Sequence, residues 1–333
     1  MKRLLTLLFV FSVFAAYSQD IHYSQFYNAP LVMNPANTGI FNGDKRILLS
    51  YKDQWSSVPV PWKTFTGSYD MKFYPENSAD HFFSGGLVFN YDRQGASKLS
   101  TSNINLTGSY TRILNSNNLF TVGVAFGYAT RGFNSDDLTW DRQWNGVALD
   151  RGLTSGEVNL SADRVSFFEN AIGANYRWQK SSRTNLDLGV SVFHIIEPKV
   201  AFFGGDDISL EKRVTLSGVG NFQMGESFDI QLHGLAQFQG GPSEYIIGAL
   251  GKFYLDNTPG SEWQLHVGAG FRTKKALYPT VAIQHKNMYV SASYDIGLSE
   301  FNKEHSGGGI ELHFRYIWAN PPSPKRVKVC PIF

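Results

Sequence analysis

The sequence is poor in charge and almost free of cysteine. Charged residues make up 17% of its 333 positions, below the roughly 25% of soluble globular domains. Cys330 is the only cysteine, so the chain forms no internal disulfide. A surface this poor in charge is not expected to face water everywhere.

Long apolar runs are also missing after the first twenty residues. Every later apolar stretch is interrupted within a few positions by a polar residue, a glycine or a charge, whereas a membrane-spanning helix needs about 20 apolar residues. A helical membrane protein is therefore not expected. Disorder is excluded as well, because 42% hydrophobic and 15% aromatic residues allow far more burial than disordered chains achieve.

Residues 1–19 are predicted to be a secretory signal peptide. Lys2 and Arg3 precede the apolar run 4–16, and Ala16-Tyr17-Ser18 offers small residues for cleavage. Removal of Lys2 and Arg3 leaves 28 basic against 28 acidic residues. The mature chain is then formally neutral, and nucleic-acid binding is not expected.

Alternation of apolar and polar residues is the dominant pattern from residue 46 onward. In 64–73, the odd-numbered positions carry mostly aromatic and apolar residues, and the even-numbered positions carry only Thr, Ser, Asp and Lys. This pattern is typical of a strand with one apolar face. The segments that show such a pattern are 46–55, 64–73, 83–92, 103–111, 120–128, 171–178, 186–192, 214–222, 228–238, 245–255, 263–271, 280–284, 290–296 and 310–318. Their number and length predict an all-β protein, a transmembrane outer-membrane barrel of about 14 antiparallel strands in contact with the lipid bilayer.

The connections are expected to alternate between short turns and longer loops, as in bacterial outer-membrane barrels. The short turns, placed on the periplasmic side, are predicted at 75–81, 115–118, 179–184, 225–227, 256–261 and 285–287, and the longer loops include 55–62, 132–166, 198–212 and 297–306. Aromatic residues at strand ends, among them Tyr74, Tyr254 and Trp318, are interpreted as interfacial girdles. A soluble sandwich or propeller is the alternative, with the aromatics in its core.

The organisation is therefore a signal peptide (1–19), a turn-rich segment (20–45), a barrel (46–319) and a basic periplasmic tail (320–333). The turn-rich segment lacks strand alternation, and it either closes the lower rim of the barrel or serves as a docking or plug element. Its candidate partner-binding residues are Gln25, Phe26, Tyr27, Pro30, Asn34 and Pro35.

A series of short motifs in and after this segment resembles one protein family. The motifs are Ser24-Gln25-Phe26-Tyr27, Pro30-Leu31, Asn34-Pro35-Ala36, Thr38-Gly39 and Gln54-Trp55. They resemble the PorP/SprF family of type IX secretion system outer-membrane proteins from the Bacteroidetes. Later positions agree, including Ser293-Tyr294-Asp295 and the terminal Cys330-Pro331, although Ile332 stands where a basic residue is expected.

The resemblance implies a non-enzymatic component of the secretion and gliding machinery in the outer membrane. The partners it implies are the translocon, periplasmic ring or peptidoglycan-linked proteins, and a secreted adhesin. It also raises the expectation that the basic tail, with Lys325, Arg326 and Cys330, docks a periplasmic partner. The tail is otherwise a short solvated end.

Two further features bear on function. In the long loop 132–166, Trp140, Asp141, Gln143 and Trp144 are candidates for partner contact or for capping the lumen. Its aspartates lack the spacing of an EF-type calcium loop, so no metal or cofactor is expected.

Histidines at 233, 266 and 313, like several serines, stand at polar strand positions that are expected to face the lumen. No nucleophile motif accompanies them, so the chain is not expected to be an enzyme. The alternative function is a transporter or porin that carries a solute through the lumen.

Overall fold

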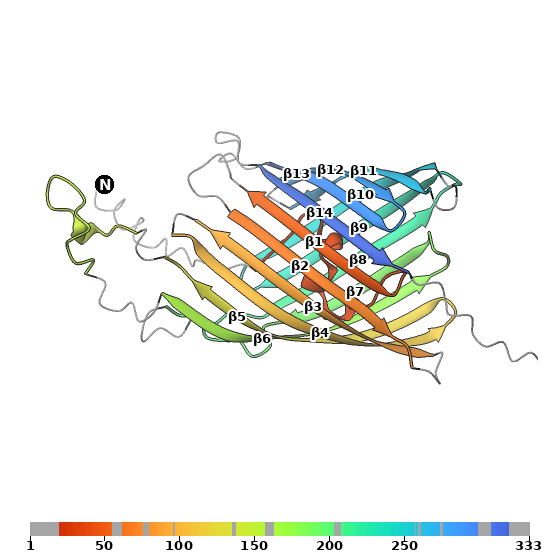
Figure 1. The fold of residues 1–333 in the computed structure, drawn as a ribbon, viewed down its shortest axis with the longest axis horizontal. Coiled ribbons are helices and arrows are strands. Elements are labelled where there is room, and N and C mark those ends of the chain that lie inside the picture. Colours follow the sequence, from red (N-terminus) through yellow and green to blue (C-terminus); the bar gives the residue numbers. More distant parts are fainter. Residues whose placement is uncertain are drawn as a thin grey trace, which may run out of the picture.

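Within the residues that the structure describes, fourteen antiparallel strands close into one barrel (Figure 1). The computed structural model describes residues 20–54, 62–75, 80–95, 97–134, 138–156, 163–202, 208–256, 258, 261–273, 276–298 and 308–319. The strands are β1 (Lys45–Gln54), β2 (Trp62–Phe73), β3 (His81–Gln94), β4 (Leu99–Asn115), β5 (Asn118–Gly132), β6 (Arg164–Gln179), β7 (Asn185–Phe193), β8 (Arg213–Gln223), β9 (Phe228–Gln239), β10 (Ser243–Asp256), β11 (Trp263–Arg272), β12 (Ala276–His285), β13 (Met288–Gly297) and β14 (Gly309–Trp318). The predicted fold class and strand number are confirmed.

Each strand pairs with its sequence neighbours, and β1 also pairs with β14 to close the sheet. The closing pair runs in register from Lys45 opposite Trp318 to Gln54 opposite Gly309. Closure leaves no unpaired sheet edge, which a bilayer would not tolerate because it offers no hydrogen-bond partners.

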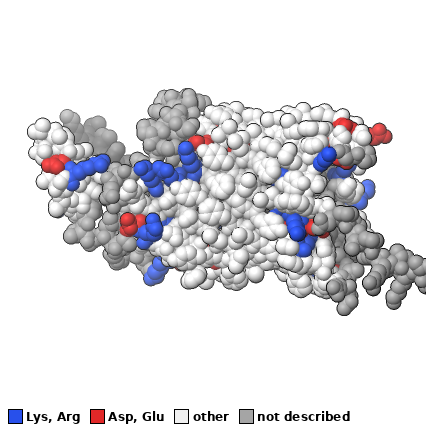
Figure 2. Space-filling view, in the orientation of Figure 1, with Lys and Arg blue, Asp and Glu red and all other residues white. Residues whose placement is uncertain are grey.

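The two faces of the barrel wall carry opposite residue types. On β5 the outward side chains of Phe120, Val122, Val124, Phe126 and Tyr128 are 41–65% exposed. Polar residues are buried at inward positions of many strands, the reverse of a water-soluble protein. In Figure 2 the charged residues gather toward the two ends of the barrel, and the surface between them carries few. This apolar belt is the face that contacts lipid.

The expected alternation of the connections holds only in part. The loops after β1, β5, β7 and β13 are long, but 95–98, 240–242 and 273–275 on the same side are as short as the opposite turns. Residues with positive φ, Gly95, Lys98 and Gly240, support two of these tight turns. The prediction that every second connection is long was wrong at these three places.

The prediction that Tyr254 faces outward at the membrane interface was also wrong. Tyr254 was assigned to an aromatic girdle, but its side chain lies on the inward face of β10, where its hydroxyl donates to a carboxylate oxygen of Asp229 at 2.6 Å. Phe253 and Leu255, its exposed neighbours, face outward.

Three short helices lie before β1: η1 (Phe26–Asn28), α2 (Pro30–Met33) and η2 (Pro35–Asn37). They lie inside the barrel (Figure 1). A fourth, η4 (Asp141–Gln143), belongs to the loop between β5 and β6. No helix among the described residues is long and apolar enough to span a bilayer.

A charge placed on the apolar belt is expected to destabilise the protein more than the same charge on a loop. Phe126→Arg puts a cation at the middle of β5, where the side chain is 65% exposed, and should lower the free energy of unfolding in vesicles by about 2–4 kcal/mol. Val147→Arg is the control, since Val147 lies on a loop and is 86% exposed. Equal losses for the two variants would contradict the assignment of the belt.

Candidate functional site

Residues 20–44, called the N-terminal segment below, fill the middle of the barrel lumen without forming strands. Pro30 and Pro35 each stand at the start of a short helix, where a missing backbone N–H is tolerated. Such short helices leave many backbone polar groups unpaired, and buried groups of this kind need partners. The inward side chains of the barrel supply them.

Glu311 on β14 holds the start of the N-terminal segment. Its carboxylate accepts the backbone N–H of Ser24 at 2.7 Å and of Gln25 at 3.0 Å. Lys52 on β1 lies 2.8 Å from the same carboxylate and 3.4 Å from Asp295 on β13. Ser24 also donates its hydroxyl to Asp295 at 2.7 Å.

Arg272 on β11 extends this cluster around the lumen. Its guanidinium lies 3.4 Å from Asp295 and 3.5 Å from Glu244 on β10, and it donates to the hydroxyl of Ser24. Lys52, Arg272, Asp295, Glu311 and Glu244 are all nearly inaccessible. Removing one member of a buried ion cluster leaves its partners unpaired, at a cost of several kcal/mol.

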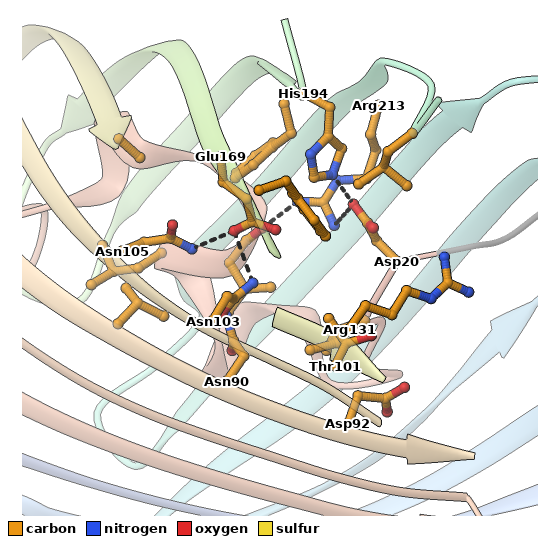
Figure 3. A pocket seen from close by; sticks show the side chains of 18 of the residues that line it. Asp20, Asn90, Asp92, Thr101, Asn103, Asn105, Arg131, Glu169, His194 and Arg213 are labelled. Carbon is orange, nitrogen blue, oxygen red and sulfur yellow. Dashed lines mark hydrogen bonds and ion pairs between the residues drawn. The ribbon is translucent and has the colours of Figure 1, made fainter. Parts of the chain in front are cut away.

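A second ion cluster holds the first described residue. Asp20 lies 2.6 Å from His194 and 3.3 Å from Arg213, and Figure 3 shows both side chains pointing toward its carboxylate. Burial alone would raise the pKa of Asp20, but the interactions with His194 and Arg213 outweigh it and hold that pKa well below its usual range. Arg213 also donates to the carbonyl of Val32 at 2.9 Å.

The turn at Asn34 packs directly against the wall. Asn34 accepts from the N–H of Ala36 at 2.8 Å and donates to the carbonyls of Ala174 on β6 and Val190 on β7 at 2.9 and 3.2 Å. This contact requires a glycine on β5, because a Cβ at Gly123 would lie 2.5 Å from the backbone nitrogen of Ala36.

An apolar cluster fastens the remainder of the segment. It joins segment residues to inward apolar residues on four strands: Tyr23, Phe26, Ala29, Leu31, Val32 and Met33 pack with Val88, Leu235, Ile246 and Tyr278. Apolar inward positions are unusual for a lumen, and here they face the segment.

The N-terminal segment separates two lumen cavities. One, of about 80 Å³, lies toward the long loops and is lined by Asp20, Leu31 and Glu169 among others (Figure 3). The other, of about 470 Å³, lies toward the short turns and is lined by Tyr27, Pro30 and residues of the turns. The segment therefore stands across the path from one end of the barrel to the other.

The six candidate residues of the N-terminal segment all lie against the barrel wall or the cavities. Gln25 exchanges hydrogen bonds of 2.8 Å with Ser293 and Ser291 on β13, and Phe26 belongs to the apolar cluster. Tyr27 and Pro30 line the larger cavity. The ion cluster around Glu311 was not predicted, although its charged residues at inward strand positions are a signal that sequence reasoning could have used.

The other candidates do not join this site. Trp140, Asp141, Gln143 and Trp144 belong to a small hairpin that projects away from the barrel (Figure 1), in which Gln143 accepts from the N–H of Trp140 at 3.0 Å. Trp144 is 55% exposed. The signal peptide (1–19) and the tail residues Lys325, Arg326 and Cys330 lie outside the described residues.

The three inward histidines have partners inside the wall. The nearest approach to a catalytic arrangement is His313, whose Nδ1 lies 2.7 Å from the Ser50 hydroxyl and whose Nε2 lies 3.5 Å from Glu311. Neither Ser50 nor His313 lines either of the two lumen cavities. His233 and His266 contact Tyr278 and Gln264 at 3.0 and 3.2 Å. Among the described residues, no group of three His, Cys, Asp or Glu is placed to hold a metal.

Known proteins resemble this chain in sequence and in fold. Residues 15–316 match the family model described as type IX secretion system membrane protein PorP/SprF. No curated protein matches in sequence.

Solved structures share the fold at very low identity. The toluene transporter TbuX of Ralstonia pickettii matches with a TM-score of 0.50 at 9% identity, over 87% of this chain and 94% of that one. A FadL homologue of Pseudomonas aeruginosa matches with a TM-score of 0.48 at 11% identity, over 85% and 92%. The family match and the barrel place the protein in the outer membrane.

Disruption of the ion cluster should reveal strong coupling between its members. Glu311→Gln and Lys52→Met should each lower the free energy of unfolding by about 3–5 kcal/mol, because each deprives a buried charge of its nearest oppositely charged partner. The double variant should lose clearly less than the sum of the two. Denaturant titration of the folded barrel measures all three.

The control is Glu197→Gln, which removes the partner of Lys212 from an ion pair of 3.4 Å that is nearly half exposed. Its expected cost is under about 1 kcal/mol. Additive losses at Glu311 and Lys52, or a loss at Glu197 as large as theirs, would show that the cluster does not act as a unit.

Proposed function

Because the chain belongs to the PorP/SprF family of type IX secretion system membrane proteins, we propose that it acts in that system as a non-enzymatic scaffold. In this role the lumen of the barrel lets no solute through, and the protein works through contacts with other components. The translocon and its periplasmic partners are the components proposed to bind it, and a secreted adhesin is proposed as its cargo partner.

The occupied lumen is the observation that carries this proposal. The N-terminal segment is tied to the wall by two buried ion clusters and an apolar cluster, and it divides the lumen into two separate cavities. A lumen filled in this way opposes passage of a solute, so the alternative of a transporter or porin is less well supported. A scaffold does not need an open lumen.

Contacts with partners then fall to surfaces outside the lumen. The hairpin 138–156 stands away from the barrel at the long-loop end (Figure 1) and presents Trp144 and Val147, which are 55% and 86% exposed. Exposed aromatic and apolar side chains of this kind are typical of binding surfaces. The basic tail, with Lys325, Arg326 and Cys330, is proposed to bind on the periplasmic side.

Deletion of Gln25–Thr38 is expected to abolish secretion while the barrel still inserts into the outer membrane. The deletion removes the apolar cluster and the Asn34 turn but no strand. Secreted proteins in the medium are measured by mass spectrometry, and insertion is measured by heat-dependent gel mobility. The purified variant should also conduct ions in planar bilayers, whereas the intact protein should be closed.

The matched control replaces the same residues with a Gly/Ser linker of equal length, which keeps the chain entry and loses the contacts. It should behave as the deletion does. Normal secretion by either variant would overturn the role of the segment. Steady conductance by the intact protein would favour the transporter, and absence of type IX components from a pull-down of the tagged protein would count against the scaffold.

A further inference from the structure

The larger lumen cavity has the size and position of a binding site. It measures about 470 Å³, within the range of about 300–1,000 Å³ of small-molecule sites. Its walls come from the N-terminal segment, from inward residues of several strands, and from turn residues such as Arg183 and Lys286. In outer-membrane barrels the short turns face the periplasm, so ligands from that compartment reach it.

The cavity is lined by more cations than carboxylates. The basic lining residues are Arg46, Arg177, Arg183, Lys252, Lys286 and Arg315, and the acidic ones are Asp187 and Asp229. Three of the cations are paired: Arg46 with Asp70 at 2.8 Å, Arg177 with Asp187 at 3.4 Å, and Arg183 with Asp229 at 2.6 Å. Among the described residues, Lys252, Lys286 and Arg315 have no carboxylate within ion-pair distance.

Lys252 and Arg315 are the important pair, because both are partly buried and bonded only to neutral groups. Lys252 donates to the side-chain oxygen of Asn221. Arg315 donates to Gln284 at 3.3 Å, and its guanidinium carbon lies 4.5 Å from the ring centre of Tyr289. Amides and a ring do not neutralise these charges, so the two cations repel each other unless an anion is bound between them.

Gln231 adds an unused donor to the same cavity. Its side chain is 7% exposed, and its Nε2 has no hydrogen-bond partner in the described structure. A buried donor without a partner costs free energy that a ligand oxygen would recover.

We propose that this cavity binds a compact phosphate-bearing anion that enters from the periplasmic end. Arg315 supplies a planar fork of donors and Lys252 a compact point charge, and together they suit a group with several anionic oxygens. Gln231 supplies a neutral donor. Lys286, exposed at the adjoining turn, attracts anions toward the opening.

The C-terminal tail of the same chain is a poor occupant. It carries Lys325, Arg326 and Lys328 and no acidic side chain, so its charge matches that of the cavity instead of complementing it. The ligand is therefore expected to be a separate molecule.

Titration of the intact protein with inorganic phosphate tests the proposal. Calorimetry in uncharged, phosphate-free detergent at constant ionic strength should show one saturable site. Lys252→Met and Arg315→Gln should each weaken binding at least about tenfold, since each removes a charged hydrogen bond. Lys212→Gln is the control, because Lys212 is paired with Glu197 outside the barrel wall, and its affinity should equal that of the intact protein.

A second measurement needs no variant. Phosphate should slow the acylation of Lys252 by a small amine-reactive acylating reagent at least about tenfold in the intact protein. It should leave the acylation of Lys212 unchanged, and mass spectrometry measures both. Water-soluble glycerol phosphate should protect Lys252 as well. Protection by micellar phosphatidic acid alone, no saturable phosphate binding, or an affinity in either cavity variant equal to that of the intact protein would each overturn the proposal.

Discussion

The carboxylate of Glu311 joins the two parts of the molecule. It belongs to the last strand of the barrel, yet two of its contacts are the backbone amides of Ser24 and Gln25, at 2.7 and 3.0 Å. A carboxylate so deeply buried is stable only with cationic partners, and Lys52 meets that need at 2.8 Å. The position of the N-terminal segment, the separation of the two cavities and the closed lumen all depend on this contact and on the ions around it.

The bilayer explains why so many polar groups are inside. Lipid takes the apolar face of every strand, so the polar face points inward, and the interior must satisfy the groups it buries. The N-terminal segment resolves part of this problem because its backbone amides and carbonyls pair with Glu311 and Arg213. The low overall charge of the sequence reflects the lipid-facing belt, and the buried ions form a smaller set with specific partners.

The fold could be predicted from the sequence because strand periodicity is local. The alternation in 64–73 needs only neighbouring residues to be recognised, and β2 spans Trp62–Phe73. The contacts in the lumen could not be predicted in this way. Ser24 and Glu311 are 287 positions apart, and they meet only because β1 pairs with β14. Tyr254 was misassigned for a related reason, since an aromatic residue at a strand end suits either face.

Sequence reasoning singled out part of the N-terminal segment, and the role it assigned to those residues, binding a partner, stays a prediction. The motif residues Gln25, Phe26 and Asn34 were singled out, and each contacts the barrel wall. Lys52, Arg272 and Glu311 were missed, because a sequence does not show which of the inward-facing charged residues meet. The cations at 252 and 315 were missed for the same reason. Only the closed barrel shows which inward charges have partners and which face a cavity.

Hydrogen exchange of the intact protein in lipid nanodiscs tests the central claim most directly. Amides that are buried and hydrogen-bonded exchange only when the structure opens. The account predicts that the amides of Ser24, Gln25, Asn28 and Asn34 exchange as slowly as those in the middle of β1 and β14. Exchange of these four amides at the rate of the exposed hairpin 138–156 would contradict it, because a segment held by Glu311 and its neighbours cannot be open to solvent.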